Sequence, residues 1–191
     1  MIKSVFRAIF RLNGWHISSG IPPESGNCIM VAAPHTSNWD LIYAMAALDK
    51  LGINTRFTIK KEFNKFPFSY ILSSMGALWI DRTATKNKNL KMTDIMAAFF
   101  ESEEAPLAML VTAEGTRSPV SQWKTGFYYT AVKANVPICL SYLDYKKKEA
   151  GIGLCFMPSG DIESDMRKIM AFYSGKTARF PEKFKPDERY S

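Results

Sequence analysis

The sequence predicts an α/β protein: a single layered domain with a mixed, largely parallel sheet flanked by helices, preceded by an N-terminal amphipathic helix. Three observations lead to this fold class. Short apolar runs of strand length alternate along the chain with segments of helical periodicity. The chain has 191 residues, enough for one domain with a core built around a sheet. Its 47% apolar and 23% charged residues are ordinary for a globular protein.

The first expected element is an amphipathic helix over Met1–Leu12. Apolar side chains follow helical spacing on one side: Ile2, Val5, Phe6, Ile9 and Phe10. Basic side chains recur at every fourth position beside them: Lys3, Arg7 and Arg11. Such a helix suits a membrane interface, with its cations at the level of the lipid phosphates. It suits equally a helix packed on the domain with a solvated basic edge, and the sequence leaves both interpretations open.

Strands and helices are expected to alternate along the rest of the chain. Six short apolar runs predict buried strands, at Cys28–Ala33, Thr55–Ile59, Leu78–Ile80, Leu107–Thr112, Pro137–Tyr145 and Ile152–Phe156. Five segments with apolar residues at helical spacing predict helices, at Trp39–Lys50, Phe66–Met75, Leu90–Ser102, Gly126–Ala134 and Ile162–Tyr173. The chain is accordingly divided into the N-terminal helix (residues 1–20), the layered domain (21–175) and a charged C-terminal tail (176–191).

The charge of the chain favours an anionic partner. Lys and Arg number 25 against 18 Asp and Glu, which gives a net charge of +7. The partner could be nucleic acid, a phospholipid surface or a phosphorylated small molecule, and composition does not choose among them. No apolar run approaches the ~18–20 residues that span a bilayer. No signal peptide is recognised either, so we expect any membrane contact to be peripheral.

Cysteine and histidine usage limits the redox and metal chemistry to be expected. Cys28, Cys139 and Cys155 each sit beside apolar residues and form no Cys-x-x-Cys pair. An odd number of thiols in apolar runs predicts buried, reduced cysteines in a cytoplasmic protein. Because His16 and His35 are the only histidines, we expect no histidine-rich metal site.

The most distinctive segment is Pro-His-Thr-Ser-Asn-Trp-Asp, which ends at Asp40 and lies where a predicted strand gives way to a helix. In α/β domains, ligands bind at the carboxyl ends of strands. His35 could take a proton from a hydroxyl near neutral pH, and Asp40 could accept the imidazole N–H and fix its tautomer. Taken alone the His-x4-Asp spacing is a weak pattern. A structural loop histidine and an acid favoured by the helix dipole would produce it too.

A second polar loop follows the predicted strand Leu107–Thr112, and it contains Glu114, Gly115, Thr116 and Arg117. The glycine lets the backbone approach a ligand, the hydroxyl donates a hydrogen bond, and the guanidinium offers a planar fork that suits phosphate. Lys124, seven residues after Arg117, could add a charge. The alternative is a polar turn in which Arg117 pairs with Glu114.

Two more segments complete the pattern: Arg82, at the end of the third predicted strand, and Val136-Pro137-Ile138, which opens the fifth. Arg82 is a candidate phosphate ligand or half of a surface ion pair with Asp81. In this order and spacing, the four segments resemble the four sequence blocks of the glycerolphosphate and lysophosphatidic-acid acyltransferase superfamily, the PlsC-like enzymes. The match runs from about Val31 to Leu140. The fourth block lacks the second proline usual in the family.

The resemblance implies that His35 is a general base with Asp40 as its partner. It implies that Arg82, Lys124 and the block Glu114, Gly115, Thr116 and Arg117 bind the phosphate and glycerol portion of an acceptor. The implied reaction moves a fatty acyl group from acyl-CoA or acyl carrier protein to the hydroxyl of a glycerol-phosphate or lysophospholipid-type acceptor, without a metal or organic cofactor.

The cysteine usage favours a cytoplasmic protein, and we expect it at the cytoplasmic face of the membrane. Peripheral contact with anionic lipid is expected, and nucleic acid is not expected as a partner. Two alternative functions stay open. One is a hydrolase of lipid esters or thioesters, in which His35 would activate water, and the other is a non-catalytic protein that binds anionic lipid.

Overall fold

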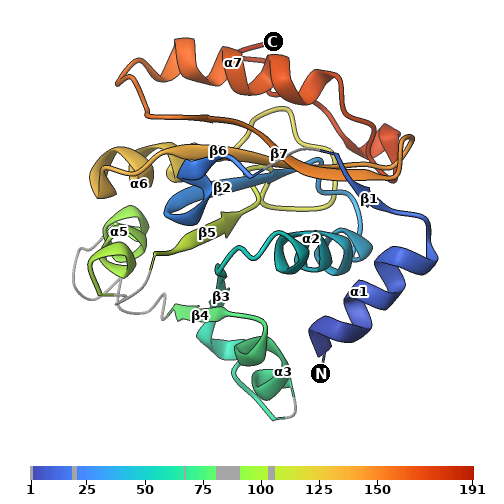
Figure 1. Ribbon diagram of the computed structural model, residues 1–191. Coiled ribbons are helices and arrows are strands. Elements are labelled where there is room, and N and C mark those ends of the chain that lie inside the picture. Colours follow the sequence, from blue (N-terminus) through green and yellow to red (C-terminus); the bar gives the residue numbers. More distant parts are fainter. Residues whose placement is uncertain (1, 19–20, 67, 81–90, 103–105) are drawn as a thin grey trace.

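The computed structural model describes residues 2–18, 21–66, 68–80, 91–102 and 106–191 (Figure 1). Within these ranges one sheet contains β1 (His16–Ile17), β2 (Cys28–Ala33), β3 (Thr55–Lys60), β4 (Ala77–Ile80), β5 (Ala108–Val111), β6 (Ile138–Asp144) and β7 (Glu149–Phe156). Their order across the sheet is β1-β7-β6-β2-β5-β3-β4. Neighbouring strands are parallel except β6 and β7, which are antiparallel. The predicted mixed, largely parallel sheet of an α/β domain is therefore confirmed.

Helices lie on both faces of the sheet, with α7 above it and α2 and α1 below it in Figure 1. The helices are α1 (Ile2–Leu12), α2 (Trp39–Lys50), α3 (Phe68–Ser74), α5 (Met92–Ser102), α6 (Gly126–Ala134) and α7 (Ile162–Ser174). Short 3₁₀ turns occur at Pro23–Gly26, Lys61–Phe63 and Pro181–Lys183. In the described part of the chain, no helix combines the length and the apolar character needed to cross a membrane.

The central strand β2 shows how the sequence builds both layers. Ile29 and Val31 join the core that contains α6 and α7, whereas Cys28 and Met30 join the core that contains α2. This division follows from the strand geometry, since successive side chains point to opposite faces. A strand covered on both faces is apolar throughout, and this explains why β2 is an uninterrupted apolar run.

Helix α1 packs against α2. Phe10 is fully buried, and its ring centre lies 5.9 Å from that of Trp15 and 6.5 Å from that of Tyr43. The structure thus shows α1 packed on the domain, which is one of the two interpretations that the sequence left open.

The edge of the sheet beyond β6 differs in detail from the prediction. β1 was not expected, because two residues give no readable periodicity; it pairs with the start of β7. β7 begins at Glu149, three residues earlier than predicted, because its pairing with β6 carries this polar residue into the strand. The three lysines 146–148 form the exposed turn between β6 and β7.

The C-terminal residues 176–191 are charged but pack against the domain through buried polar contacts. Asp187 is completely buried, and its carboxylate accepts hydrogen bonds from the Trp123 amide at 2.8 Å and from the Arg189 guanidinium at 2.7 Å. Nearer the start of this segment, the amide of Phe180 donates to the hydroxyl of Thr36 at 3.3 Å. The segment therefore reaches the loop that carries His35.

The prediction that all three cysteines are reduced is wrong for two of them. Cys139 of β6 and Cys155 of β7 form a disulfide, whereas Cys28 is a buried free thiol. Burial raises the pKa of Cys28 to about 12, which makes this thiol unreactive. Apolar neighbours in the sequence indicated burial correctly, but only the pairing of β6 with β7 brings Cys139 opposite Cys155.

Candidate active site

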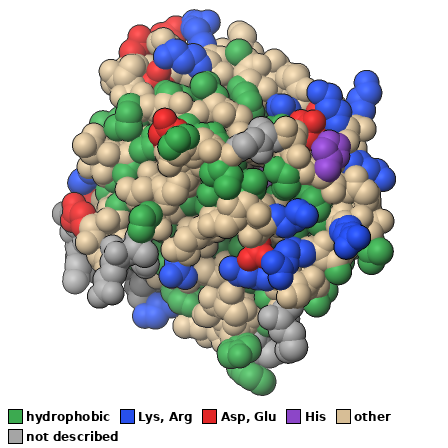
Figure 2. Space-filling model, viewed as in Figure 1, with side chains coloured by type: hydrophobic (Ala, Val, Ile, Leu, Met, Phe, Trp, Pro, Cys, Tyr) green, Lys and Arg blue, Asp and Glu red, His purple; other side chains and the backbone are tan. Residues whose placement is uncertain are grey.

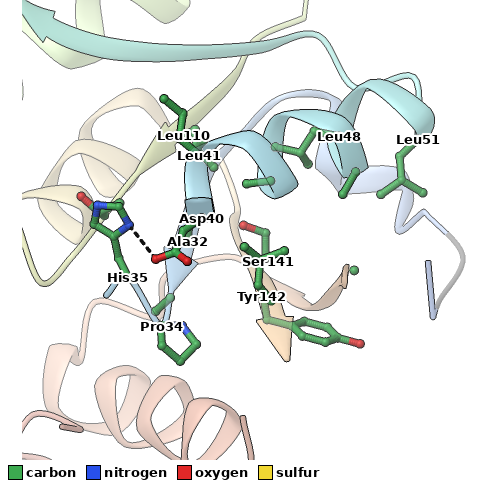
Figure 3. A pocket seen from close by; sticks show the side chains of 16 residues that line it. Ala32, Pro34, His35, Asp40, Leu41, Leu48, Leu51, Leu110, Ser141 and Tyr142 are labelled. Atoms are coloured by element: carbon green, nitrogen blue, oxygen red, sulfur yellow. Dashed lines mark ion pairs between the residues drawn. The ribbon is translucent and has the colours of Figure 1, made fainter. Parts of the chain in front are cut away.

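At the carboxyl end of the central strand β2, the loop that follows presents His35 and the first turn of α2 presents Asp40 (Figure 3). The Nδ1 atom of His35 lies 3.3 Å from Oδ2 of Asp40. The side chain of His35 is 23% exposed and that of Asp40 only 6%. The imidazole therefore reaches the surface while the carboxylate beside it is enclosed.

Asp40 accepts three hydrogen bonds in addition to its contact with His35. The backbone amides of Thr36 and Ser37 donate to Oδ2, each at 2.8 Å, and the hydroxyl of Tyr145 donates to Oδ1 at 2.6 Å. A side chain in the first turn of a helix reaches the preceding loop easily, and the helix N-terminus favours its negative charge. These donors fix the carboxylate toward the imidazole.

Glu114 lies behind His35 and faces inward. Its two carboxyl oxygens lie 2.9 and 3.2 Å from the backbone amide of His35, which donates to them. Only 5% of the residue is exposed, and this burial raises the pKa of Glu114 to about 8. The hydrogen bond from His35 lowers this pKa and the charge of Asp40 raises it, but both effects are smaller than that of burial. At neutral pH the carboxyl group is therefore mostly protonated.

The shifted pKa of Glu114 should make folding stability depend on pH. The carboxyl ionises near 4.5 in the unfolded chain and near 8 in the folded protein, so the folded state binds more protons between these values. Raising the pH from about 5 to about 8 should then lower the free energy of unfolding, by at most about 1.4 kcal/mol per pH unit. Replacing Glu114 with glutamine should remove this slope, as measured by urea unfolding across that range. The exposed Glu188→Gln serves as the control, and an undiminished slope in Glu114→Gln would contradict the assigned pKa.

The remaining residues of this loop face solvent. Gly115 has a φ of +69°, a left-handed backbone conformation that favours glycine, and the side chain of Lys124 crosses close to its Cα. Thr116, Arg117 and Lys124 are exposed. The loop thus turns its cations outward and Glu114 inward, which differs from the Glu114–Arg117 pair considered from the sequence. Arg82 lies outside the described residues, and its role stays a prediction.

An apolar pocket of about 70 Å³ opens beside His35 and Asp40 and lies against α2 (Figure 3). Aliphatic side chains form most of its wall: Leu41, Ala44, Leu48, Leu51, Leu110 and Leu143. Asp40 is the only acidic residue that lines it, and no lysine or arginine does. The pocket therefore suits an apolar chain whose polar end reaches the imidazole.

Sequence reasoning missed Tyr145 as part of this site. The residue ends a predicted apolar strand and belongs to no motif, and its partner Asp40 lies 105 residues earlier in the chain.

In the described ranges, no group of three or more His, Cys, Asp or Glu side chains could hold a metal ion.

The sequence profile of the acyltransferase family matches residues 16–143, which is more than half of the chain and includes both His35 and Asp40. The chain belongs to the acyltransferase family. Its fold is similar to that of the 1-acyl-sn-glycerophosphate (LPA) acyltransferase PlsC from Thermotoga maritima, with a TM-score of 0.58 and 17% sequence identity. The similarity covers 88% of this acyltransferase and 73% of the PlsC chain. A comparison with curated protein sequences gives no significant match.

The resemblance to PlsC-like enzymes inferred from the sequence is thereby confirmed. At 17% identity, the structural likeness concerns the fold. The donor, the acceptor and the roles of individual residues in this acyltransferase must be argued from its own site.

Proposed function

We propose that this acyltransferase moves a fatty acyl group from acyl-CoA or acyl carrier protein to the hydroxyl of a glycerol-phosphate or lysophospholipid-type acceptor, with His35 as the general base. The contact of 3.3 Å between His35 and Asp40 at the mouth of an apolar pocket is the observation that carries this proposal. Nδ1 lies 3.3 Å from Asp40, so in the proposed tautomer it carries its proton on that side and leaves Nε2 to accept a proton from the acceptor.

In the proposed reaction, Nε2 of His35 takes the proton of the acceptor hydroxyl while its oxygen attacks the thioester carbonyl. The tetrahedral intermediate then collapses, the C–S bond breaks, and the carrier thiolate leaves and takes the proton from the imidazolium. Asp40 stabilises the imidazolium between these two transfers. The products are the new oxygen ester and the free thiol, and no metal or organic cofactor enters the step.

The cations beside the dyad are proposed to bind the phosphate of the acceptor. Arg117 and Lys124 are exposed on the neighbouring loop, together with the hydroxyl of Thr116, and Arg82 is included on the basis of its sequence block. An arginine fork can contact two phosphate oxygens, whereas lysine contributes a point charge. Gly115 allows the loop to approach the acceptor, and the inward-facing Glu114 holds the amide of His35. The apolar pocket beside His35 and Asp40 is proposed to hold part of the fatty chain next to the reacting carbonyl.

The test is the release of free thiol from palmitoyl-CoA and palmitoyl carrier protein by the purified protein. The acceptor panel contains lysophospholipids, glycerol phosphate, glycerol and no acceptor. Release that requires a phosphate-bearing acceptor and yields its ester would support the proposal. Release without any acceptor would instead favour the hydrolase, and lipid binding without release from any donor would favour the non-catalytic protein.

We also propose peripheral contact of this protein with anionic lipid at the cytoplasmic face of the membrane. The basic stripe of α1 is exposed, although Lys3 and Arg7 both lie near Asp49, at 3.5 and 3.3 Å. Exposed apolar side chains accompany it on α1 and near α3: Val5, Leu12, Phe66 and Tyr70. Figure 2 shows Lys and Arg side chains on the side where α1 lies and hydrophobic side chains projecting at the end where α3 lies. Cations beside exposed apolar groups match an anionic bilayer surface.

Neutralising the three cations of α1 should weaken binding to phosphatidylglycerol vesicles about 100-fold, since each surface cation contributes about 1 kcal/mol. The variant carries glutamine at Lys3, Arg7 and Arg11, and binding is measured by vesicle sedimentation at low salt. A control with glutamine at Arg167, Lys183 and Lys185 has the same net charge. Equal weakening in both triple variants would show that the protein's overall charge, and not α1, determines binding.

A further inference from the structure

We propose that Tyr145 is a positioning residue of this acyltransferase, whose hydroxyl holds the Asp40 carboxylate in the orientation that acts on His35. The inference rests on the proposed function, in which His35 is the base. Tyr145 lies just past the end of β6, far from the His-x4-Asp segment in sequence, and it is outside the matched family region.

The two oxygens of Asp40 have separate sets of partners. Oδ2 faces Nδ1 of His35 and accepts the amides of Thr36 and Ser37, whereas Oδ1 accepts the hydroxyl of Tyr145 at 2.6 Å. Rotation of the carboxylate would break contacts on both sides at once. Tyr145 is therefore the partner that fixes the oxygen turned away from the imidazole.

The ring of Tyr145 is held from three parts of the chain. It makes edge contacts with the rings of Trp15 at 4.9 Å and Tyr43 at 6.0 Å. The guanidinium of Arg179, from the C-terminal segment, lies 5.8 Å from the ring centre. The backbone amide of Tyr145 also donates to the carbonyl of Thr177 at 2.9 Å. These contacts leave the phenol little freedom to move away from Asp40.

The hydroxyl of Tyr145 is a donor throughout the working pH range. Burial raises the pKa of Tyr145 far above its ordinary value, the hydrogen bond to Asp40 raises it further, and Arg179 lowers it in part. Besides Tyr145, two ionisable groups lie near the dyad: Glu114, which accepts from the His35 amide, and Arg179, which contacts the phenol of Tyr145. Tyr145→Phe therefore removes the hydrogen bond to Asp40 and the contact of the hydroxyl with Arg179, and it leaves the contact of Glu114 with the His35 amide in place.

Without that hydroxyl, Oδ1 of Asp40 loses its donor and the carboxylate becomes more basic. A more basic carboxylate holds a proton on the neighbouring imidazole more tightly. The acidic limb of the kcat/KM profile, where the base becomes protonated, should consequently move to higher pH.

Tyr145→Phe tests this inference, with Tyr128→Phe as the matched control. Tyr128 is buried and donates to the carboxylate of Asp165 at 3.0 Å, away from the dyad, so both variants lose one Tyr–Asp hydrogen bond. In Tyr145→Phe we expect kcat for thiol release to fall about tenfold, since a misdirected base catalyses less well. The KM values should stay within about twofold and the acidic limb should move upward. Tyr128→Phe should change none of these.

A second readout does not need activity. The chain has only two histidines, so in a His16→Gln background the proton NMR signals of His35 can be followed alone against pH. Their titration midpoint should move to higher pH in Tyr145→Phe and stay in place in Tyr128→Phe. Coincident midpoints and pH profiles in the two variants would overturn the inference, even if both lose thermal stability. A shifted midpoint in a protein without His35-dependent thiol release would retain the Tyr145–Asp40–His35 coupling and refute the proposed function instead.

Discussion

Replacing His35 with alanine should lower kcat for acyl transfer about 10²–10⁴-fold, the usual contribution of a general base. The loss should fall on kcat, with little change in KM for either substrate, because proton transfer develops only in the transition state. Alanine keeps the backbone amide that donates to Glu114, so the loop should keep its position. The measurement is the initial rate of thiol release over a range of donor and acceptor concentrations.

His16→Ala is the matched control for this experiment. His16 is the only other histidine, and it is exposed at the sheet edge, 3.9 Å from Glu149. The His16→Ala variant should release thiol at the same rate as the unaltered protein. If the His35 variant retained more than about a tenth of kcat, His35 could not be the base, since the loss would fall below the range for general-base catalysis.

Replacing Asp40 with asparagine should lower kcat by about 10²-fold or more. The amide is neutral and no longer stabilises an imidazolium, and its NH₂ group can donate to Nδ1 and select the wrong tautomer. The same substitution also alters Oδ2 of Asp40, which accepts hydrogen bonds from the backbone amides of Thr36 and Ser37. Thermal denaturation should accompany the kinetics, so that loss of structure is separated from loss of catalysis.

Asp49→Asn is the control within the same helix. Asp49 lies near the end of α2, beside Lys3 and Arg7 of α1, so its loss should affect helix packing and leave kcat unchanged. A folded Asp40→Asn protein with unaltered kcat would show that Asp40 is only a first-turn acid favoured by the helix dipole, which is the simpler interpretation of the sequence pattern. The two substitutions thus separate catalytic from structural use of a helix carboxylate.

The local pattern of apolar and polar residues predicted most of the secondary structure of this protein and the location of its candidate site. Apolar runs and helical spacing located the helices and most strands, because periodicity records which side of each element is covered. The position of His35 and Asp40 between a strand and a helix predicted a site at the end of a central strand. The structure confirms the α/β fold and brings the two side chains into contact.

Contacts between distant parts of the chain were not predictable in this way. The pairing of Cys139 with Cys155 depends on the register between β6 and β7. The inward orientation of Glu114 depends on the backbone amide of His35, which follows β2 and donates to the Glu114 carboxyl group. The hydrogen bond from Tyr145 to Asp40 joins residues 105 positions apart. The sequence by itself determined the elements, the sheet type and the candidate dyad, since these depend on local periodicity and short spacing. Only the tertiary structure decided which buried groups meet, because burial and pKa depend on partners brought together by folding.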